Sequence, residues 1–479
     1  MAWAMGQIFV FGELIAHRNS VVSSLNARSL WLGPLDFHDT LVANAFGDYR
    51  TTLGDVTRHP CMGVWLTYAQ NRKADPSIGR YPDENYAREV LQLFSIGVNE
   101  LRQNGTVRTH LVDGVRVPIE TYDNERIREF AKVFTGLTYA QVADPPEWQP
   151  RKEYTLPIVM FEPEHEPGPK TLLGGYSIPA GQSGMQDIDA ALDHIAAHPN
   201  VGPFMARRLI QRFVKSNPSK WYVRRVADAF ADNGHGVRGD WAAVLKAVLL
   251  DPEAIASQVR TTHIERLPSG KKRIVGLTIG GRGTEWSKLR EPVLRYTALM
   301  RQFDPASDYP TGRMMLHTRT YDLTQGPLKS PSVFNFYLPD HRPAGELMEY
   351  AASNRIADGA LFAPEFQILN ATTQVRMANR FGEDLLDATV TMYVPPPSQG
   401  GSYSINVTLD LSDEIALRDD SAALMDRLDL LLCHGTMSDQ AKQTIAEALD
   451  QHPINWSDTR HVGYAVLLTM TSPDGAITE

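Results

Sequence analysis

The sequence lacks the features that mark several large protein classes. It has only two cysteines among 479 residues, Cys61 and Cys433, and they match no CxxC pattern of a metal or redox site. We therefore expect both to be free, buried thiols. No apolar run reaches the roughly 18 residues that span a bilayer, which argues against an integral membrane segment. The hydrophobic fraction of 43% and charged fraction of 22% exclude a disordered or collagen-like chain.

An excess of basic charge is also missing. Lys and Arg number 47 against 56 Asp and Glu, so the formal net charge is −9, and we expect no nucleic-acid partner. The chain contains no GxxxxGK[ST], no HExxH and no GxSxG motif. The usual fingerprints of phosphate-binding loops, zinc proteases and hydrolase nucleophile elbows are therefore absent.

The N-terminus gives no indication of an export signal. Residues 1–10, MAWAMGQIFV, lack the basic stretch and following apolar core of a secretory leader. They are instead typical of the inside of an apolar helix, which is an unusual start for a domain. We expect them to pack as a helix into the body, with an upstream segment preceding them.

Helical periodicity dominates the pattern of apolar residues. Residues 84–96 carry an apolar stripe, with Asp83 as N-cap and Gly97 as C-cap, and residues 124–135 repeat this pattern before Gly136. Further helices are expected at 186–197, 203–215, 220–232, 240–250, 288–303, 364–383, 421–434, 438–450 and 459–470.

Strand signals are few and local. Asp113-Gly114 is a hairpin turn signal between residues 106–108 and 115–117, and a second ribbon is expected from 389–394 and 404–409. No βαβ alternation is present. The sequence thus predicts a mainly α fold, a large helical architecture with small β ribbons and no parallel sheet. We expect an N-terminal helical lobe at 1–251, an irregular linker region with one helix at 252–345, and a C-terminal helical lobe with a ribbon at 346–479.

One polar cluster lies on the helix expected at 84–96. Asn85, Arg88, Glu89 and Gln92 have the spacing of a single helix face, and Glu84 can pair with Arg88 at i, i+4. Glu89 could act as an acid or base and Arg88 could hold an anion, with Asn85 and Gln92 as binding residues. The alternative is a structural network or a solvated face.

A second cluster occupies a loop rich in Pro and Gly. It comprises Glu162, Glu164, His165, Glu166 and Lys170. Two or three of these side chains could bind a divalent metal, or His165 could be a general base beside an anion held by Lys170. The alternative is a solvated loop in which His165 and Lys170 bond the backbone.

Two further features have simpler interpretations. Arg207, Arg208 and Arg212, with Lys215 nearby, could bind phosphate or an acidic glycan, but we favour a solvated helix face with salt bridges. His59 and His198 each precede a proline, and we expect them to cap helix ends.

Nearly the whole sequence resembles one bacterial family. The segment PDENYAREVLQLFSIG at 82–97 is similar to a motif of the family catalogued as domain of unknown function 1800. Other matching segments follow in the right order: NAFGDYR at 44–50, TRHP at 57–60, FAKVFTG at 130–136, HEPGPK at 165–170, LG at 173–174, HP at 198–199, ARRL at 206–209, PSVFNF at 331–336 and APEFQI at 363–368.

The resemblance implies a largely helical bacterial protein without an established activity. Members commonly carry an export leader, and their genes often neighbour those of a sulfatase-like family. The family pattern H-[DE]-x-G-x-K falls at 165–170, which singles out the His165 loop. This sequence departs from the family in lacking the leader, and in having Phe94 where many members have His.

Two functional hypotheses follow. The first is a cell-envelope accessory or binding protein that acts with a sulfatase-like partner. The alternative is a metal-assisted hydrolase, in which His165, Glu166 and Lys170 share a cleft with Glu89 and Arg88. A divalent metal is then the candidate cofactor, whereas its ligands, the substrate and the reaction are not readable from the sequence.

Overall fold

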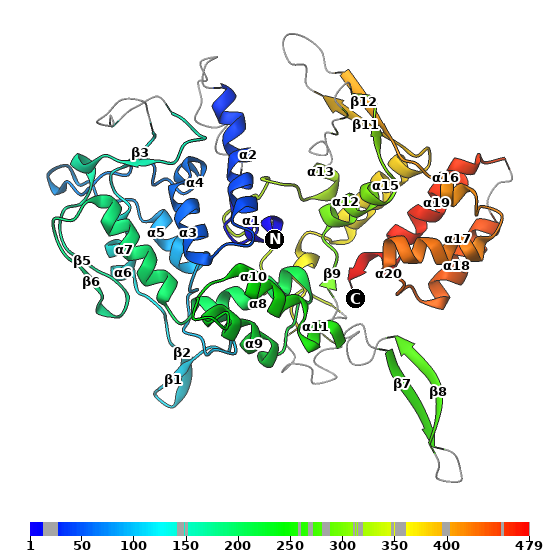
Figure 1. Ribbon diagram of the computed structural model, residues 1–479, viewed down its shortest axis with the longest axis horizontal. Coiled ribbons are helices and arrows are strands. Elements are labelled where there is room, and N and C mark those ends of the chain that lie inside the picture. The colour runs from blue at the N-terminus through cyan, green and yellow to red at the C-terminus, as the bar shows by residue number, and fades with distance from the viewer. Residues whose placement is uncertain are drawn as a thin grey trace. The chain divides into compact units, whose positions relative to one another are not determined.

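The chain forms two compact units, which are described separately below (Figure 1). Unit 1 comprises Met1–Phe213, Pro218–Ala254 and Leu328–Asn335, and unit 2 comprises Val214–Asn217, Ile255–Pro327 and Phe336–Glu479. The computed structural model describes residues 1–12, 27–140, 148, 152–256, 260–266, 272–279, 288–309, 312, 314, 320–345, 349, 361–394, 403–451 and 455–478. The three-lobe division expected from the sequence stays a prediction.

Helices build most of unit 1. They are α1 (Ala2–Gly6), α2 (Ala27–Ala43), α3 (Tyr49–Arg58), α4 (Pro60–Trp65), η2 (Pro76–Ile78), α5 (Asn85–Gln92), α6 (Asn124–Val133), η3 (Glu162–Glu164), η4 (Leu173–Gly175), α7 (Gly184–Ala197), α8 (Val201–Phe213), α9 (Lys220–Ala231) and α10 (Trp241–Leu249). The short helix α11 (Pro252–Ala256) follows at the end of this stretch of sequence. The helices expected between 84 and 250 are therefore confirmed, with ends shifted by a few residues.

The strands of unit 1 form three antiparallel pairs. They are β1 (Thr109–Val112) with β2 (Val115–Pro118), β3 (Leu137–Thr138) with β4 (Val159–Met160), and β5 (Lys170–Thr171) with β6 (Ser177–Ile178). The first is the expected hairpin, in which the turn at Asp113-Gly114 pairs Val112 with Val115. The other two pairs are only two residues long, too short for a periodic signal.

Helix ends in unit 1 follow their capping residues. Asp123 accepts a hydrogen bond from the Arg126 amide at the start of α6, and Ser183 forms a capping box with Gln186 at the start of α7. The expected capping by histidine is confirmed. His59 accepts from the Cys61 amide at the start of α4, and His198 accepts from the Asn200 amide beside α8.

An aromatic cluster forms the centre of unit 1. Tyr86 on α5 stacks on Tyr68 with ring centroids 4.0 Å apart and meets Phe134 edge-on at 4.8 Å. Phe94 and Phe9 join this cluster and are fully buried. Residues 1–10 are thus packed into the body as expected, although only Ala2–Gly6 are helical.

Unit 2 is also mainly helical. Its helices are α12 (Pro292–Gln302), α13 (Thr320–Leu323), η8 (Pro364–Gln367), α15 (Ala371–Leu385), α16 (Ser412–Ile415), α17 (Ser421–Leu428), the π-helical turn η9 (Asp429–Cys433), α18 (Asp439–Asp450), α19 (Asp458–Thr471) and α20 (Pro473–Ala476). One core joins these elements, with Phe381, Val390 and Val466 fully buried in it.

Small antiparallel sheets accompany these helices. They are β7 (Arg260–Arg266) with β8 (Lys272–Ile279), β9 (Lys288–Leu289) with β13 (Ile477–Thr478), and β12 (Tyr403–Thr408) between β11 (Thr389–Val394) and β10 (Ala306–Ser307). In the described parts of both units every sheet has two or three antiparallel strands. The mainly α fold without a parallel sheet is therefore confirmed.

Three expected helices of unit 2 are interrupted. The stretch 288–303 begins as strand β9 and becomes helical only at Pro292, the preferred first residue of a helix. The stretch 364–383 is split because Asn370 caps a new helix, and the stretch 421–434 ends in the π-helical turn η9. In these places local caps and turns, rather than the apolar periodicity, determine where the helices begin and end.

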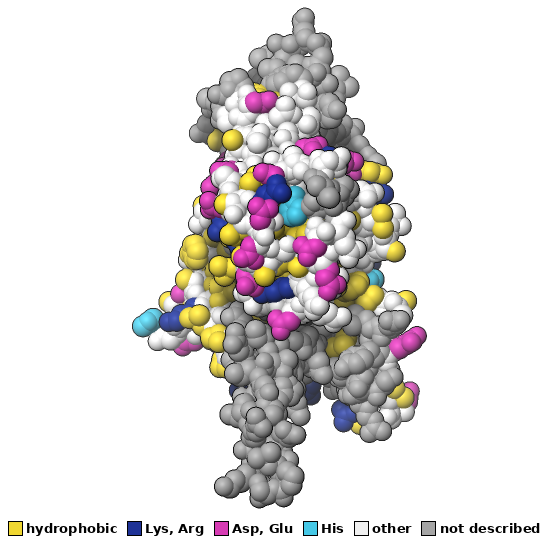
Figure 2. Space-filling model, turned by 90° about the vertical axis from the view of Figure 1, so that its right-hand side faces the viewer, with side chains coloured by type: hydrophobic (Ala, Val, Ile, Leu, Met, Phe, Trp, Pro, Cys, Tyr) yellow, Lys and Arg dark blue, Asp and Glu magenta, His cyan; other side chains and the backbone are white. Residues whose placement is uncertain are grey.

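The acidic character of the chain is concentrated at its C-terminal end. Residues 410–479 contain 13 Asp and Glu against 4 Lys and Arg, a difference of 4 − 13 = −9 that equals the charge of the whole chain. Figure 2 shows acidic side chains spread over the face of unit 2 that it turns to the viewer. The remaining 409 residues are formally neutral, so the net charge of the chain carries no information about unit 1.

The sequence argued against a membrane-spanning helix and predicted two free, buried cysteines. Within the described ranges, no helix combines the length and apolar composition that crossing a membrane requires. Cys61 and Cys433 are both buried thiols, as expected.

Candidate functional site

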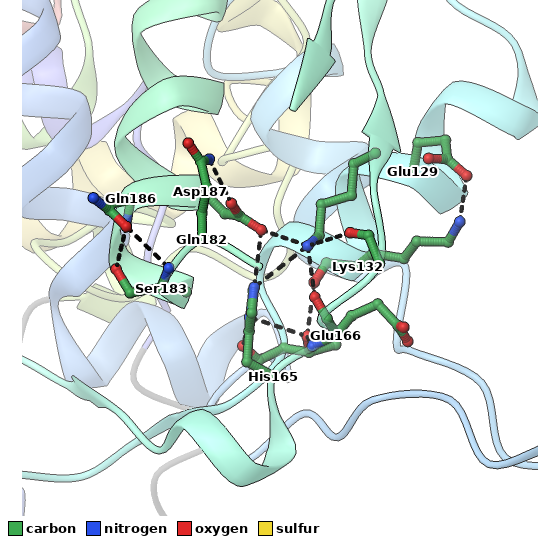
Figure 3. Close-up of polar contacts among 12 residues, drawn as sticks. Glu129, Lys132, His165, Glu166, Gln182, Ser183, Gln186 and Asp187 are labelled. Atoms are coloured by element: carbon green, nitrogen blue, oxygen red, sulfur yellow. Dashed lines mark hydrogen bonds and ion pairs between the residues drawn. The ribbon is translucent and has the colours of Figure 1, made fainter. Parts of the chain in front are cut away.

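The His165 loop of unit 1 lies between strands β4 and β5 and packs against the start of α7 (Figure 3). It begins with the turn η3 and is stiffened by Pro163, Pro167 and Pro169. Inside it, His165 is 3% exposed and Lys170 is 1% exposed. His165 and Lys170 are thus buried within a loop whose Glu162, Pro163 and Pro167 are exposed.

Lys170 is held by three acceptors. Its ammonium group donates to the Glu166 carbonyl at 2.6 Å, to the Gly168 carbonyl at 3.0 Å and to the Asp187 carboxylate on α7. An ammonium group has three N–H bonds, and each has an acceptor here. The Lys170–Asp187 pair is thus a buried, saturated ion pair that ties the loop to α7.

His165 is engaged at both ring nitrogens. Its Nε2 lies 3.0 Å from Asp187 Oδ2, and its Nδ1 lies 2.9 Å from the Thr135 carbonyl at the end of α6. Both partners are acceptors, so each ring nitrogen is placed to donate. The Lys170 ammonium is a further neighbour of Nε2, at 3.4 Å. Both nitrogens therefore face groups of the protein rather than solvent.

Neighbouring residues complete this network. Gln182 donates to the second oxygen of Asp187 at 2.9 Å, and the Glu166 amide donates to the Thr135 hydroxyl at 2.9 Å. Burial alone raises the pKa of Asp187, but hydrogen bonds from Lys170, Gln182 and His165 outweigh it and hold the pKa below its usual value. We call the set of Thr135, His165, Lys170, Gln182 and Asp187 the His165 clamp.

Two glycines make room for the clamp. Gly136 has a φ of +85°, and a Cβ there would lie 2.9 Å from the His165 backbone nitrogen. A Cβ on Gly184, the first residue of α7, would lie 2.9 Å from Cγ of the His165 ring. Any larger residue would therefore push the imidazole away from its partners.

The remaining carboxylates of the loop point to separate partners. Glu162 accepts from the Gly184 amide at the N-terminus of α7 at 3.1 Å, Glu164 pairs with Arg72, and Glu166 accepts from the Ala74 amide at 3.3 Å. Among the residues that the structure describes, no three His, Cys, Asp or Glu side chains are arranged to hold a metal ion. The carboxylates of this loop instead accept hydrogen bonds or form ion pairs with separate residues.

The cluster on α5 is arranged differently. Arg88 pairs with Glu84 at 3.1 Å, as its i, i+4 spacing indicated, and its side chain is 40% exposed. Asn85 donates to the Thr67 hydroxyl at 3.3 Å. Gln92, the last residue of α5, is half-buried. Arg88 thus lies at the surface with Glu84 as its partner.

Glu89 is the exceptional member of this helix. It is 6% exposed, and its Oε2 is buried without a hydrogen-bond partner among the described residues. The hydroxyl of Tyr122 is also buried without a hydrogen-bond partner among the described residues. Burial raises the pKa of Glu89, an effect that the nearby Arg88 charge only partly offsets. Perturbed titratable groups of this kind occur often at functional sites.

The α5 cluster and the His165 clamp form separate sets of polar contacts in the described residues. The ring nitrogens of His165 contact Thr135, Asp187 and Lys170, and within the described residues no hydrogen bond or ion pair links α5 to the clamp. The expectation of one shared cleft therefore stays a prediction. Helix α5 contacts the end of α6 through the ring of Tyr86, which packs against Phe134, the residue before Thr135.

The basic residues of α8 show a structural contact. The guanidinium of Arg208 lies over the Phe204 ring, 4.8 Å from its centroid, one turn earlier on the same helix. Lys215, beyond the end of α8, is buried rather than solvated. The solvated face expected from the sequence therefore does not include Lys215.

Sequence reasoning missed Asp187 and Tyr122. Asp187 lies on the buried face of α7 with Ile188, Ala191 and Ile195, and an acidic residue within such an apolar stripe is a recognisable signal. Tyr122 lies in the segment between β2 and α6, where no local pattern marks it. Asp187 meets its partners only through the tertiary fold.

The comparisons with known proteins agree with the resemblance seen in the sequence. Comparisons with curated proteins and with solved structures returned no match. A family model described as protein of unknown function matches residues 15–476, nearly the entire chain. The chain therefore belongs to the family of proteins of unknown function catalogued as DUF1800.

Proposed function

We propose that this protein is an accessory or binding protein of the bacterial cell envelope that acts with a sulfatase-like partner. The partner and compartment come from the family resemblance. The observation that carries a binding role is the β1–β2 hairpin, which projects from unit 1 (Figure 1). Leu111 is 65% exposed and Val115 is 63% exposed on this hairpin, and Val112 beside them is 46% exposed.

An exposed apolar hairpin is unusual on a protein that acts alone. A two-stranded sheet is only marginally stable by itself, and open strand edges with apolar side chains invite pairing with another chain. Contiguous exposed apolar surface commonly marks a site of protein association. The tip of the hairpin, with Val112 and Val115 on one face and Leu111 on the other, is therefore the proposed docking surface.

The base of the hairpin is firmly attached. The buried Asn200 side chain donates to the Ile96 and Asn99 carbonyls, at 3.0 and 2.8 Å, and accepts from the Leu101 amide at 2.9 Å. Arg108 pairs with Glu100 at 2.6 Å. A preorganised arm loses little conformational entropy on binding, which supports a docking role.

The test is a binding measurement between the purified chain and the sulfatase-like protein encoded beside it. The double variant Leu111→Asp, Val115→Asp should weaken binding at least about tenfold, because a charge at an apolar contact costs more than about 1.4 kcal/mol. Ile78→Asp makes the same kind of change at a position of unit 1 that is 68% exposed, and it should leave the affinity unchanged. Absence of binding by the unaltered chain, or equal affinity of the double variant, would refute the proposal.

The second candidate function is a hydrolase that uses the α5 helix, favoured by the raised pKa of Glu89. A carboxyl group with a raised pKa suits a general acid. The metal-assisted version has weaker support, because the loop carboxylates are engaged elsewhere and His165 lies within the clamp. His165, Glu166 and Lys170 then have positioning roles in the fold, and Glu89 with Arg88 remains the reactive pair of this hypothesis.

A further inference from the structure

The ribbon of β7 and β8 in unit 2 carries positive charge within an acidic chain (Figure 1). Its two strands, Arg260–Arg266 and Lys272–Ile279, contain four Lys and Arg residues against one Glu, a net charge of 4 − 1 = +3. The chain as a whole has a net charge of −9. A local excess of the opposite sign is therefore a specific feature of this ribbon, and it favours an anionic partner.

The register of the ribbon gives its two faces different compositions. Residues that pair directly across two antiparallel strands share a face, and the faces alternate along each strand. One face holds the pairs Arg260–Ile279, Thr262–Leu277, Ile264–Ile274 and Arg266–Lys272, and the other holds Thr261–Thr278, His263–Gly276 and Glu265–Arg273. The first face thus has four aliphatic residues between basic ends, whereas no pair of the second face includes an aliphatic residue.

A register shift keeps the apolar face continuous. The shift falls between His263 and Ile264, so that Ile264 pairs with Ile274 and Val275 is passed over. Without this extra residue Ile264 would pair with Val275, and Ile274 would move to the polar face opposite Glu265. The irregularity in the strand thus gathers the aliphatic residues of both strands on one face.

The ribbon is not part of a larger sheet. β7 and β8 form a sheet of two strands, and among the described elements each packs along its length against the other alone. A two-stranded ribbon is only marginally stable in water unless another element covers its apolar face. The ribbon therefore calls for a partner that offers both an apolar surface and negative charge.

An anionic bilayer meets both requirements. Its headgroups carry the negative charge, and the boundary of the acyl chains lies directly below them. Lysine and arginine suit such a boundary, because their long aliphatic stems pack on apolar groups while the charge stays in water. A nucleic acid would satisfy the charge through its phosphates but would leave the four aliphatic residues without an apolar surface.

We propose that the β7–β8 ribbon docks this protein on the surface of an anionic membrane. The face that holds Ile264, Ile274, Leu277 and Ile279 lies against the acyl boundary, and the basic ends of the same face lie among the headgroups. The docking is peripheral and needs no spanning segment. It is separate from the hairpin docking surface of unit 1 and does not depend on it.

Vesicle flotation of the full chain tests the proposal. The chain should bind phosphatidylcholine vesicles that contain about 25% phosphatidylglycerol at least about tenfold more tightly than vesicles of phosphatidylcholine alone. Binding should weaken at about 0.5 M salt, which screens the headgroup charge. Arg266→Gln combined with Lys272→Gln should weaken binding to the anionic vesicles at least about tenfold, because two charges near the surface are lost.

A matched pair of variants tests the apolar face. Ile264→Asn combined with Ile274→Asn leaves the charge unchanged and should weaken binding at least about tenfold, because it puts two amides in place of two aliphatic groups at the acyl boundary. Thr261→Asn combined with Thr278→Asn makes the same kind of change at a cross-strand pair of the polar face and should have no effect. The melting temperature of each variant should stay close to that of the unaltered chain.

Three outcomes would overturn the proposal. The first is a failure of the unaltered chain to bind the anionic vesicles. The second is unchanged binding by the variant at Ile264 and Ile274, which would reveal a purely ionic contact. The third is binding of double-stranded DNA as tight as binding of the vesicles, which would reveal a general polyanion site.

Discussion

Replacing Lys170 by methionine should lower the free energy of unfolding by about 3–5 kcal/mol, the range for breaking a buried ion pair. Methionine fills a similar volume but removes the charge and all three hydrogen bonds that Lys170 makes. Asp187 would then lie 2% exposed without its strongest partner. Chemical denaturation of the full chain, followed by a probe in unit 1, measures the loss.

Lys132 provides the matched control for this variant. It also forms an ion pair, with Glu129, but its side chain is 34% exposed. Pairs of that kind contribute about 0–1 kcal/mol, so Lys132→Met should be nearly neutral. If Lys170→Met were as mild as Lys132→Met, the His165 clamp would not be an important source of stability.

Replacing Gly136 by alanine should destabilise the chain by about 2–5 kcal/mol. The left-handed backbone conformation costs a non-glycine residue about 1–2 kcal/mol, and overpacking adds about 1–3 kcal/mol. The overpacking arises because the new Cβ would lie 2.9 Å from the His165 nitrogen and 2.8 Å from the Met160 sulfur. Thermal and chemical denaturation measure this effect.

A variant at Gly181 separates the conformational cost from the overpacking cost. Its φ of +81° is almost the same, but nothing lies within 4 Å of a Cβ placed there. Gly181→Ala should therefore cost only the conformational part, about 1–2 kcal/mol. Equal losses for the two variants would mean that the close approach of Gly136 to the His165 backbone has no energetic consequence.

The sequence predicted the helical framework well because its signals are local. Helix α6 ends at Phe134, shortly before Gly136, as its pattern indicated. The caps expected for α5 were wrong in detail, because Glu84 rather than Asp83 is its N-cap and Leu93 rather than Gly97 is its C-cap. The two-residue strands β3 to β6 were missed, because so short a segment has no period. The break at Asn370 was missed because the apolar pattern continues across the cap.

The candidate site was predicted only in part, for reasons of distance along the chain. His165 and Lys170 share one loop, so their proximity was readable, but their common partner Asp187 is 17 residues beyond Lys170. Glu89 was recognised from its place on an apolar helix. The partner of each polar group was harder to predict, because a charged residue on a largely apolar helix can find a local partner at the surface, as Arg88 does in Glu84.

Chemical modification of histidines in the native full chain tests the structural role of His165 most directly. Diethyl pyrocarbonate reacts with accessible, unprotonated imidazole nitrogens, and peptide mass mapping gives the rate at each histidine. His110 and His235 are exposed and should be modified rapidly, whereas His165, at 3% exposure and with both nitrogens engaged, should react only when the chain unfolds. Rapid modification of His165 in the folded protein, at a rate similar to that of His110, would show an accessible imidazole and contradict the assignment of His165 to a buried clamp.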